Sequence, residues 1–296
     1  MGKYINIYQL FRRKTLPLFL KHRIRDNAAG ARNKDEFISN LSFVKFNKLY
    51  SDKFNTSLNP DWLAWFVGFS EGDGYLGINE NRPVFVLTQK ESKILYEIRD
   101  ILQFGYVKEF DKFSRFIVRD RVNILLLFHL FNGNLHVEHK INQLISWSKY
   151  LNKDDNFLNV IVKPVKISLN NSWFSGFVDA EGCFNVYIPK SVKGVNIRFI
   201  VDQQYGLSLF KEIKDIFGSG SIYARKNENY RLTLANLNTL PFVIEYFDNY
   251  ALRTKKQLAF KKWKIVYNCV LNKEHKTTEG MNKLKELSAL VNKDND

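Results

Sequence analysis

The sequence predicts an α+β fold in which two copies of one αββαββα unit are related by a pseudo-two-fold axis. A nine-residue motif occurs twice, as FVGFSEGDG at residues 66–74 and as FSGFVDAEG at 174–182. Both copies are followed by similar residues in the same order. Within each copy the strand-like segments are short and consecutive, so they should pair as antiparallel hairpins.

The repeat extends well beyond the motif. Four further matches follow in order, namely Gln89 with Gln203, Gly105 with Gly220, Lys140 with Lys256, and Trp147 with Trp263. We therefore divide the chain into a basic N-terminal extension and linker (1–58), a first repeat (59–151), an inter-repeat linker (152–170), a second repeat (171–267) and a C-terminal helical tail (268–296).

Each copy is expected to begin with a helix that carries the motif. In the first copy Asn59 is a good N-cap and Pro60 suits the first helical position. The helices are predicted over 60–73 and 172–181, followed by strands (75–79 and 83–89; 183–189 and 195–203), a helix (91–102; 205–217), two more strands (105–110 and 114–119; 220–225 and 229–235) and closing helices (121–130 with 139–150; 237–247 with 254–266).

One face of each motif helix carries small residues at a four-residue spacing, which lets two helix backbones approach closely. We therefore expect the two motif helices to pack against each other through these faces. The small residues are Ala64, Gly68 and Gly72 in the first copy, and Ser172, Gly176 and Ala180 in the second. The large residues beside them should fill the core of their own copy; these are Trp62, Trp65, Phe69, Trp173 and Phe177.

An acid follows each row of small residues, Asp73 in the first copy and Glu181 in the second, and a glycine follows each acid. Symmetry brings the two carboxylates together at the negative ends of two helix dipoles, so a cation should compensate for their repulsion. Paired carboxylates that hold Mg²⁺ suit phosphodiester hydrolysis. A solvated helix end would explain one such acid, but the duplication favours a metal site. Glu71 and Asp179 lie two residues earlier and are interpreted as structural.

The composition indicates a polyanionic partner. The net charge is +15 and the isoelectric point is about 9.6, values typical of proteins that bind nucleic acid or an anionic membrane surface. The sequence has no apolar stretch of about 18 residues, so no transmembrane helix is expected. Cys183 and Cys269 form no disulfide framework, and cysteine and histidine show no zinc-type spacing.

The two motifs resemble those of the LAGLIDADG homing endonucleases, especially the single-chain, two-motif type of fungal mitochondria. The resemblance covers about 59–292 and includes FNGNL (131–135), HK (139–140) with Trp147, and KEHKTTEGMNKLKEL (273–287). It implies saddle-shaped antiparallel sheets over the DNA major groove, with the motif helices at the repeat interface. Ser70 and Glu71 depart from the usual apolar residue and Asp, but the metal-binding position is intact.

The resemblance implies that Asp73 and Glu181 bind the catalytic metals, and Gly72 and Ala180 are included in the predicted metal site. Mg²⁺ is the expected ion, and Mn²⁺ or Ca²⁺ can occupy the same sites. Four more residues are catalytic candidates. Lys140 and Lys256 begin matching helices and could approach the scissile phosphates or lie on a helix surface, while Gln89 and Gln203 end matching strands near the acids and could support them or form ordinary hydrogen bonds.

Alternation along the strands predicts an outward sheet face rich in Arg, Asn, Thr and Tyr, which suits contacts to base edges and phosphates. Any one of these residues could instead be an ordinary solvated residue. In the first copy the predicted DNA-binding residues are Tyr75, Asn79, Arg82, Arg115 and Arg119, with Ile117 on the same face. In the second copy they are Asn185, Tyr187, Asn196, Arg198, Tyr223, Arg225, Asn229, Arg231 and Thr233.

The resemblance thus implies a site-specific, metal-dependent double-strand DNA endonuclease that acts as a monomer. Two alternatives share the fold: an intron maturase that binds host intron RNA to assist splicing, and a non-catalytic DNA-binding regulator. Both acids are retained, which favours cleavage. Residues 1–25 carry Lys and Arg but no acid, as in a transit peptide, and the composition suggests A/T-rich codons, so a mitochondrial or other organellar location is expected. An extension that lies on the domain surface or on DNA explains these residues equally well.

Overall fold

The computed structural model describes residues 41–152, 158–162, 165–189, 194–291 and 293, which lie in one compact unit, Ile38–Asp296. The interpretations of residues 1–25 as a transit peptide or a surface extension concern residues outside the described ranges.

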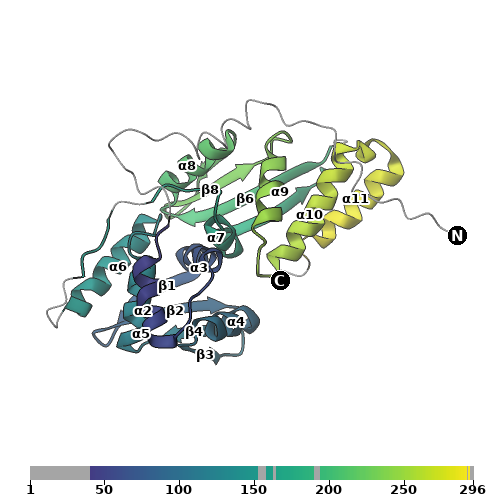
Figure 1. The fold of residues 1–296 in the computed structure, drawn as a ribbon. Coiled ribbons are helices and arrows are strands. Elements are labelled where there is room, and N and C mark those ends of the chain that lie inside the picture. The colour runs from purple at the N-terminus through teal and green to yellow at the C-terminus, as the bar shows by residue number, and fades with distance from the viewer. Residues whose placement is uncertain (1–40, 153–157, 163–164, 190–193, 292, 294–296) are drawn as a thin grey trace. The chain divides into compact units, whose positions relative to one another are not determined.

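The predicted doubled unit is confirmed (Figure 1). The first repeat consists of α3 (Pro60–Asp73), β1 (Gly74–Asn79), β2 (Arg82–Gln89), α4 (Ser92–Leu102), β3 (Tyr106–Glu109), β4 (Ser114–Val118), α5 (Arg121–Phe131) and α6 (Glu138–Leu151). The second consists of α7 (Trp173–Glu181), β5 (Gly182–Tyr187), β6 (Asn196–Gln204), α8 (Leu207–Phe217), β7 (Ser221–Ala224), β8 (Asn229–Leu234), α9 (Leu240–Asn249) and α10 (Lys256–Leu271).

Each repeat builds one antiparallel sheet, with strand order β1-β2-β4-β3 in the first and β5-β6-β8-β7 in the second. The registers correspond. Val86 of β2 lies between Tyr75 and Ile117 of its neighbours, and the equivalent Ile200 of β6 lies between Cys183 and Thr233. Helices α4, α5 and α6 pack against the first sheet, as α8 and α10 do against the second. Equivalent positions of the two repeats can therefore be compared strand by strand.

Helices α3 and α7 pack against each other between the two sheets (Figure 1). A Cβ atom at Gly68 would overlap the carbonyl oxygen of Trp173, and one at Gly176 would overlap that of Trp65. The contact is therefore reciprocal, as a pseudo-two-fold axis requires. The predicted role of the small residues is confirmed, because only glycine fits at these two positions.

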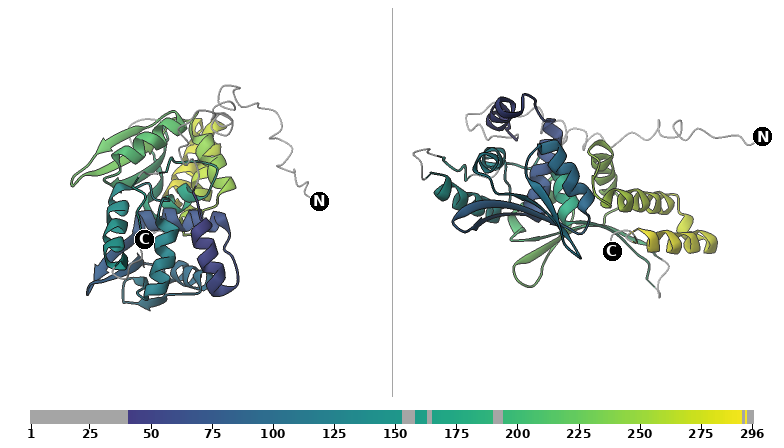
Figure 2. Two further views of the ribbon diagram at one scale, coloured as in Figure 1. Left: turned by 60° about the vertical axis from the view of Figure 1, so that its left-hand side comes forward. Right: turned by 90° about the horizontal axis from the view of Figure 1, so that it is seen from below.

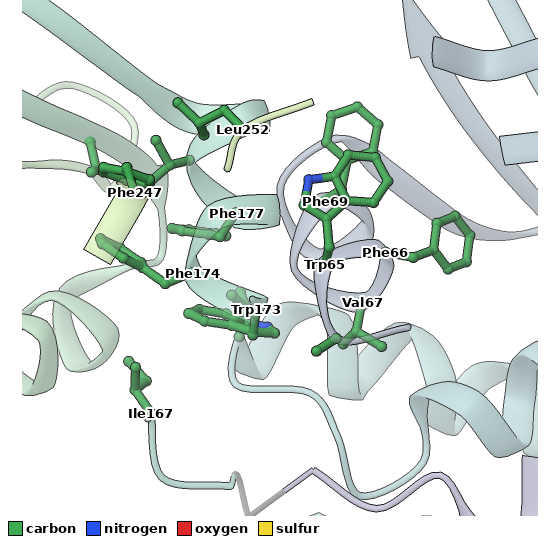
Figure 3. Close-up of a cluster of buried hydrophobic side chains, with 14 of the residues drawn as sticks. Trp65, Phe66, Val67, Phe69, Ile167, Trp173, Phe174, Phe177, Phe247 and Leu252 are labelled. Carbon is green, nitrogen blue, oxygen red and sulfur yellow. The ribbon is translucent and has the colours of Figure 1, made fainter. Parts of the chain in front are cut away.

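Trp65 and Trp173 are buried in the core, as expected, but each also contacts the other copy. Trp65 Nε1 donates a hydrogen bond to Asp179 Oδ2 across the helix pair at 2.8 Å, and Trp173 Nε1 donates to Glu71 Oε2 at 2.7 Å. A buried indole N–H group is stabilised by an acceptor, and the facing helix supplies one for each of these two. In Figure 3 the two indoles lie beside the helix contact, whereas Phe66 points away from it.

Glu71 and Asp179 have the structural role that was predicted for them. The Glu71 carboxylate is fully buried and also accepts hydrogen bonds from the backbone N–H groups of His136 and Val137. The Asp179 carboxylate accepts from the backbone N–H groups of Arg253 and Thr254. Each acid is therefore hydrogen-bonded both to a loop of its own repeat and to a tryptophan of the other repeat.

The interpretation of residues 1–58 as an N-terminal extension and linker is wrong for its last part. Helix α2 (Val44–Phe54) packs against α5, and the side chains of Phe46 and Tyr50 are fully buried in the first repeat. The Ser42 N–H group donates to Asn134 Oδ1 at 2.7 Å. The helical spacing of Phe43, Phe46 and Tyr50 could have revealed this element, but the lysines and asparagines between them obscured it.

The C-terminal tail is helical, as predicted. Helix α10 continues to Leu271, past the predicted end at 266, and is followed by the short turn η3 (Glu274–Lys276) and by α11 (Thr278–Leu290). Helix α11 packs on α10 and reaches β5 (Figures 1 and 2). Within the described ranges, no helix is both long and apolar enough to cross a bilayer.

Candidate active site and nucleic-acid interface

The two candidate metal ligands end the two central helices, Asp73 in α3 and Glu181 in α7. The glycines that follow have extended backbones, with φ of −77° at Gly74 and −84° at Gly182, so neither is a left-handed helix cap. Glycine is needed for space instead. A Cβ atom at Gly74 would overlap the Ser70 carbonyl oxygen, and one at Gly182 would overlap Val178. Each strand can therefore start immediately after the acid.

The two carboxylates lie close enough to affect each other. Burial, and then the charge of Asp73, raise the pKa of Glu181 to about 7. Burial also raises the pKa of Asp73 above its ordinary value. Gly72 lies beside the opposite acid, since a Cβ atom there would be 3.1 Å from Glu181 Cγ. The site is therefore an electrostatically unfavourable pair of acids, to which a cation would be attracted.

Both predicted lysines lie at this site. Lys140 is in the first turn of α6 and its Nζ donates to the Gly74 carbonyl oxygen. Lys256 begins α10 and its Nζ donates to the carbonyl oxygens of Ala180 at 2.6 Å and Val178 at 3.2 Å. Burial lowers the pKa of both ammonium groups, while the neighbouring acids oppose that change. The lysines therefore hold positive charge against the carbonyl ends of the motif helices.

The two predicted glutamines are not equivalent. Gln89 Nε2 donates to Asp73 Oδ2 at 2.6 Å, so this side chain fixes the first carboxylate. Gln203 Nε2 donates to the Gln204 carbonyl oxygen at 3.2 Å, and its Oε1 atom is buried without a hydrogen-bond partner in the described structure. Only the first glutamine is therefore joined to an acid.

The chemistry of the site fits a hydrated magnesium ion. Across the described residues, no cluster of three or more His, Cys, Asp and Glu side chains could hold a metal. Two carboxylates are nevertheless enough for Mg²⁺, which keeps several waters and takes phosphate oxygens from a substrate. The Ala180 carbonyl oxygen, one of the predicted ligands, accepts from Lys256 Nζ, so an ion would share that atom with the lysine.

Most residues predicted to bind DNA are at least partly exposed on the outward sheet faces. Ile117, which was placed on the same face, is only 5% exposed because Val86 and Tyr106 flank it in register. Asn229 is half-buried, and its Oδ1 atom is covered. The exposed residues are Tyr75, Asn79, Arg82, Arg115, Arg119, Tyr187, Asn196, Tyr223 and Arg225, and the half-buried ones are Asn185, Arg198, Arg231 and Thr233.

The sequence reasoning missed an acid on the outward face of the second sheet. Asp202 Oδ1 and Oδ2 accept hydrogen bonds from Arg231 Nε at 2.8 Å and Nη2 at 2.6 Å, and Arg225 Nη1 lies 3.5 Å from Oδ1. The alternation that identified Asn196 and Arg198 also places Asp202 outward, so the signal was present. Beside it lies a hollow of about 740 Å³ whose lining includes Arg198, Arg225 and Arg231.

Comparison with known proteins identifies similar sequences. The profile described as LAGLIDADG endonuclease matches residues 174–267, within the second repeat. The chain is 33% identical over 248 residues to the "Probable intron-encoded endonuclease 4" of Neurospora crassa, a match that covers 80% of this chain and 45% of that protein. It is 26% identical over 216 residues to the "Intron-encoded RNA maturase bI4" of Saccharomyces cerevisiae, with 67% of this chain and 31% of that protein covered. The chain thus spans less than half the length of either relative.

Solved structures share the fold. The LAGLIDADG homing endonuclease I-GzeII in complex with its DNA target is 22% identical, with a TM-score of 0.60 and coverage of 78% of this chain and 97% of that one. I-SmaMI bound to an uncleaved DNA target in the presence of calcium ions is 17% identical, with a TM-score of 0.60 and coverage of 80% and 100%. Both contain the same doubled α+β arrangement that the present chain shows.

Proposed function

Because the chain belongs to the LAGLIDADG homing endonuclease family, we propose that it hydrolyses phosphodiester bonds at specific sites in double-stranded DNA with the help of divalent metal ions. One observation carries the proposal. Asp73 and Glu181 end two helices that approach closely at Gly68 and Gly176, and the charge of Asp73 raises the pKa of Glu181. A stable fold gains nothing from two half-buried, repelling acids, whereas a metal-dependent nuclease needs them.

Each residue of the site has a distinct part in the proposed reaction. Asp73 and Glu181 would hold Mg²⁺, with the backbone at Gly72 and Ala180 beside them. When bound, the ion lowers the pKa of an attacking water and offsets charge that develops on the phosphate. Gln89 keeps the Asp73 carboxylate in one orientation through its 2.6 Å hydrogen bond. Mn²⁺ and Ca²⁺ take the same kinds of ligand.

Lys140 and Lys256 would act on the phosphate side of the site. Their ammonium groups lie at the ends of α3 and α7, where their charge can offset that of a phosphate. We propose that the outward sheet faces bind the duplex on both sides of these groups, and that the protein acts as a monomer in a mitochondrion or another organelle. The intron-encoded relatives support this location.

The second candidate function is that of an intron maturase. The similarity to the yeast RNA maturase supports it, and the same basic faces could bind a structured host intron RNA. A maturase does not need the paired acids, so their retention favours cleavage. Binding to RNA and cleavage of DNA can be measured on the same protein, and one chain can have both activities.

Cleavage of a randomised duplex library in Mg²⁺, with Ca²⁺ as the non-cleaving condition, tests the proposed function. The wild type should cut a defined subset of duplexes. Asp73→Asn and Glu181→Gln should each abolish cutting but still bind that subset in Ca²⁺. Glu245→Gln, at an exposed position on α9, is the matched control and should cut normally. Robust cutting by either active-site variant would refute the assignment, and tight RNA binding without any duplex cleavage would favour the maturase.

A further inference from the structure

Two arginines on the outward face of the second sheet are held in the same way by a neighbouring strand. Arg198 of β6 donates from Nε and Nη2 to Asn185 Oδ1, at 3.0 and 2.7 Å. Arg231 of β8 donates from Nε and Nη2 to Asp202, at 2.8 and 2.6 Å. In both cases the acceptor belongs to the residue directly opposite in the antiparallel register.

This contact uses only one edge of each guanidinium group. The group is a rigid planar fork, so hydrogen bonds at Nε and Nη2 fix its plane and leave the Nη1–Nη2 edge pointing elsewhere. That second edge can donate two parallel hydrogen bonds. Guanine offers two matching acceptors, O6 and N7, in the major groove. Arg198 and Arg231 both line the hollow on this face, so the outward side of the pair is accessible.

From this geometry we propose that Asp202 and Asn185 are positioning residues that hold Arg231 and Arg198 for the recognition of guanines by the second repeat. The proposal rests on the proposed function, because it concerns how the DNA target is read. An arginine that is already held loses less conformational freedom when it binds a base. The negative charge of Asp202 also weakens attraction to phosphates, which carry no sequence information. Each held arginine should therefore increase the discrimination between base sequences more than it increases the total affinity for DNA.

The first sheet lacks the equivalent arrangement at these positions. Thr88 lies opposite Arg115 where the second sheet has Asp202 opposite Arg231. The Arg115 guanidinium instead lies over the rings of Phe110 and Phe113, at 5.5 and 5.0 Å from their centroids. Gly77 and Val84 occupy the places of Asn185 and Arg198.

The two held arginines should read different base pairs. Arg198 and Asp202 are four residues apart on β6, which corresponds to about 13 Å along a strand. The duplex rises about 3.4 Å per base pair, so the two side chains cannot meet at one base. Two separate guanine preferences are expected in the half-site of the second repeat.

The test is the binding of a randomised duplex library in Ca²⁺, with the preference at each base pair compared among variants. Asp202→Ala should reduce the preference for one guanine by about tenfold, at the base pair where Arg231→Lys does the same. Asp202→Asn should keep most of it, since Asn185 shows that one amide oxygen can hold an arginine. Asn185→Ala and Arg198→Lys should share a second position. Thr88→Ala is the matched control and should leave both preferences unchanged.

Other outcomes distinguish a failure of this inference from a failure of the proposed function. If Asp202→Ala and Asp202→Asn both strengthen binding to all duplexes equally, Asp202 acts only through its charge and the inference is wrong. If Arg231→Lys keeps every base preference of the wild type, Arg231 reads no base and the inference is equally wrong. A wild type that binds duplexes without any preference would instead refute the proposed function itself. Thermal melts of each variant identify any that fail to fold, and Arg231→Lys then tests the same base pair without touching Asp202.

Discussion

Trp65 of the first repeat donates its indole N–H to the carboxylate of Asp179 in the second repeat, at 2.8 Å. The reverse pair, Trp173 with Glu71, makes the same contact at 2.7 Å. Each motif contains one acid that is not a candidate metal ligand, Glu71 in the first and Asp179 in the second. These two acids therefore join the two repeats. This explains how two acids of one motif, two residues apart, can have unrelated roles: one is satisfied inside the helix interface, and the other lies at its end.

Removal of either indole donor should destabilise the protein. Trp173→Phe and Trp65→Phe each leave a buried carboxylate with one hydrogen bond fewer, at a cost of about 1.5–3 kcal/mol in the free energy of unfolding. Trp62→Phe is the control, because the Trp62 indole nitrogen is buried without a hydrogen-bond partner in the described structure. Urea denaturation measures all three, and an equal cost for Trp62→Phe would mean that ring packing, not the hydrogen bond, matters.

The glycine contact should be intolerant of a single methyl group. Gly176→Ala places a Cβ atom on the Trp65 carbonyl oxygen, so α3 and α7 must separate. We expect a loss of about 1–3 kcal/mol or more of stability. Gly194→Ala is the control, since a Cβ atom there meets nothing within 4 Å. Thermal melts of the two variants should differ clearly, and comparable melting temperatures would contradict the close approach.

Glu181 should make the stability of the metal-free protein depend on pH. Its pKa is about 7 in the folded protein, against 4.5 as its ordinary value, so between these values the folded state keeps a proton that the unfolded state releases. Stability contributed by this proton is present below pH 4.5 and is lost as the pH rises through 7. In EDTA, the free energy of unfolding of Glu181→Gln, relative to that of the wild type, should therefore rise by about 1–3 kcal/mol as the pH is raised from 5 to 8.

Saturating Mg²⁺ should remove that advantage, because only the wild type keeps both carboxylates for the ion. Asp73→Asn should change stability in the same direction but less, since the Gln89 hydrogen bond already favours the charged form of Asp73. Melting curves at the two pH values, with and without metal, provide the measurement. Variants that are less stable than the wild type at both pH values would show that the carboxylates are structural partners.

Affinity for duplex DNA should fall steeply with salt. The net charge of +15 and the basic outward faces imply many phosphate contacts. If about ten phosphates are neutralised, log K should fall against log salt with a slope near −9. Fluorescence anisotropy on one duplex at several salt concentrations gives the slope. A slope near zero on duplex DNA, together with tight RNA binding, would favour the maturase.

The fold could be predicted well from the sequence because the pattern that indicates each element occurs twice, once in each repeat. The small residues around Gly68 and Gly176 even indicated which helix faces meet. The sequence could not show that Trp65 and Trp173 cross the interface, because hydrophobic spacing does not say which acceptor a buried N–H group finds. It did not reveal helix α2, whose apolar spacing is interrupted by lysines, or Asp202, an acid on a strand face that otherwise carries basic and amide side chains.

The close contact between α3 and α7 lies within a single polypeptide, through the connection at residues 152–170. A homodimer built on the same contact would separate on dilution, and its melting temperature would vary with protein concentration. Here each half experiences its partner at a fixed effective concentration set by the connecting segment. The two halves of a homodimer must have the same sequence, but the two repeats of one chain need not. One sheet can therefore carry Thr88 where the other carries Asp202.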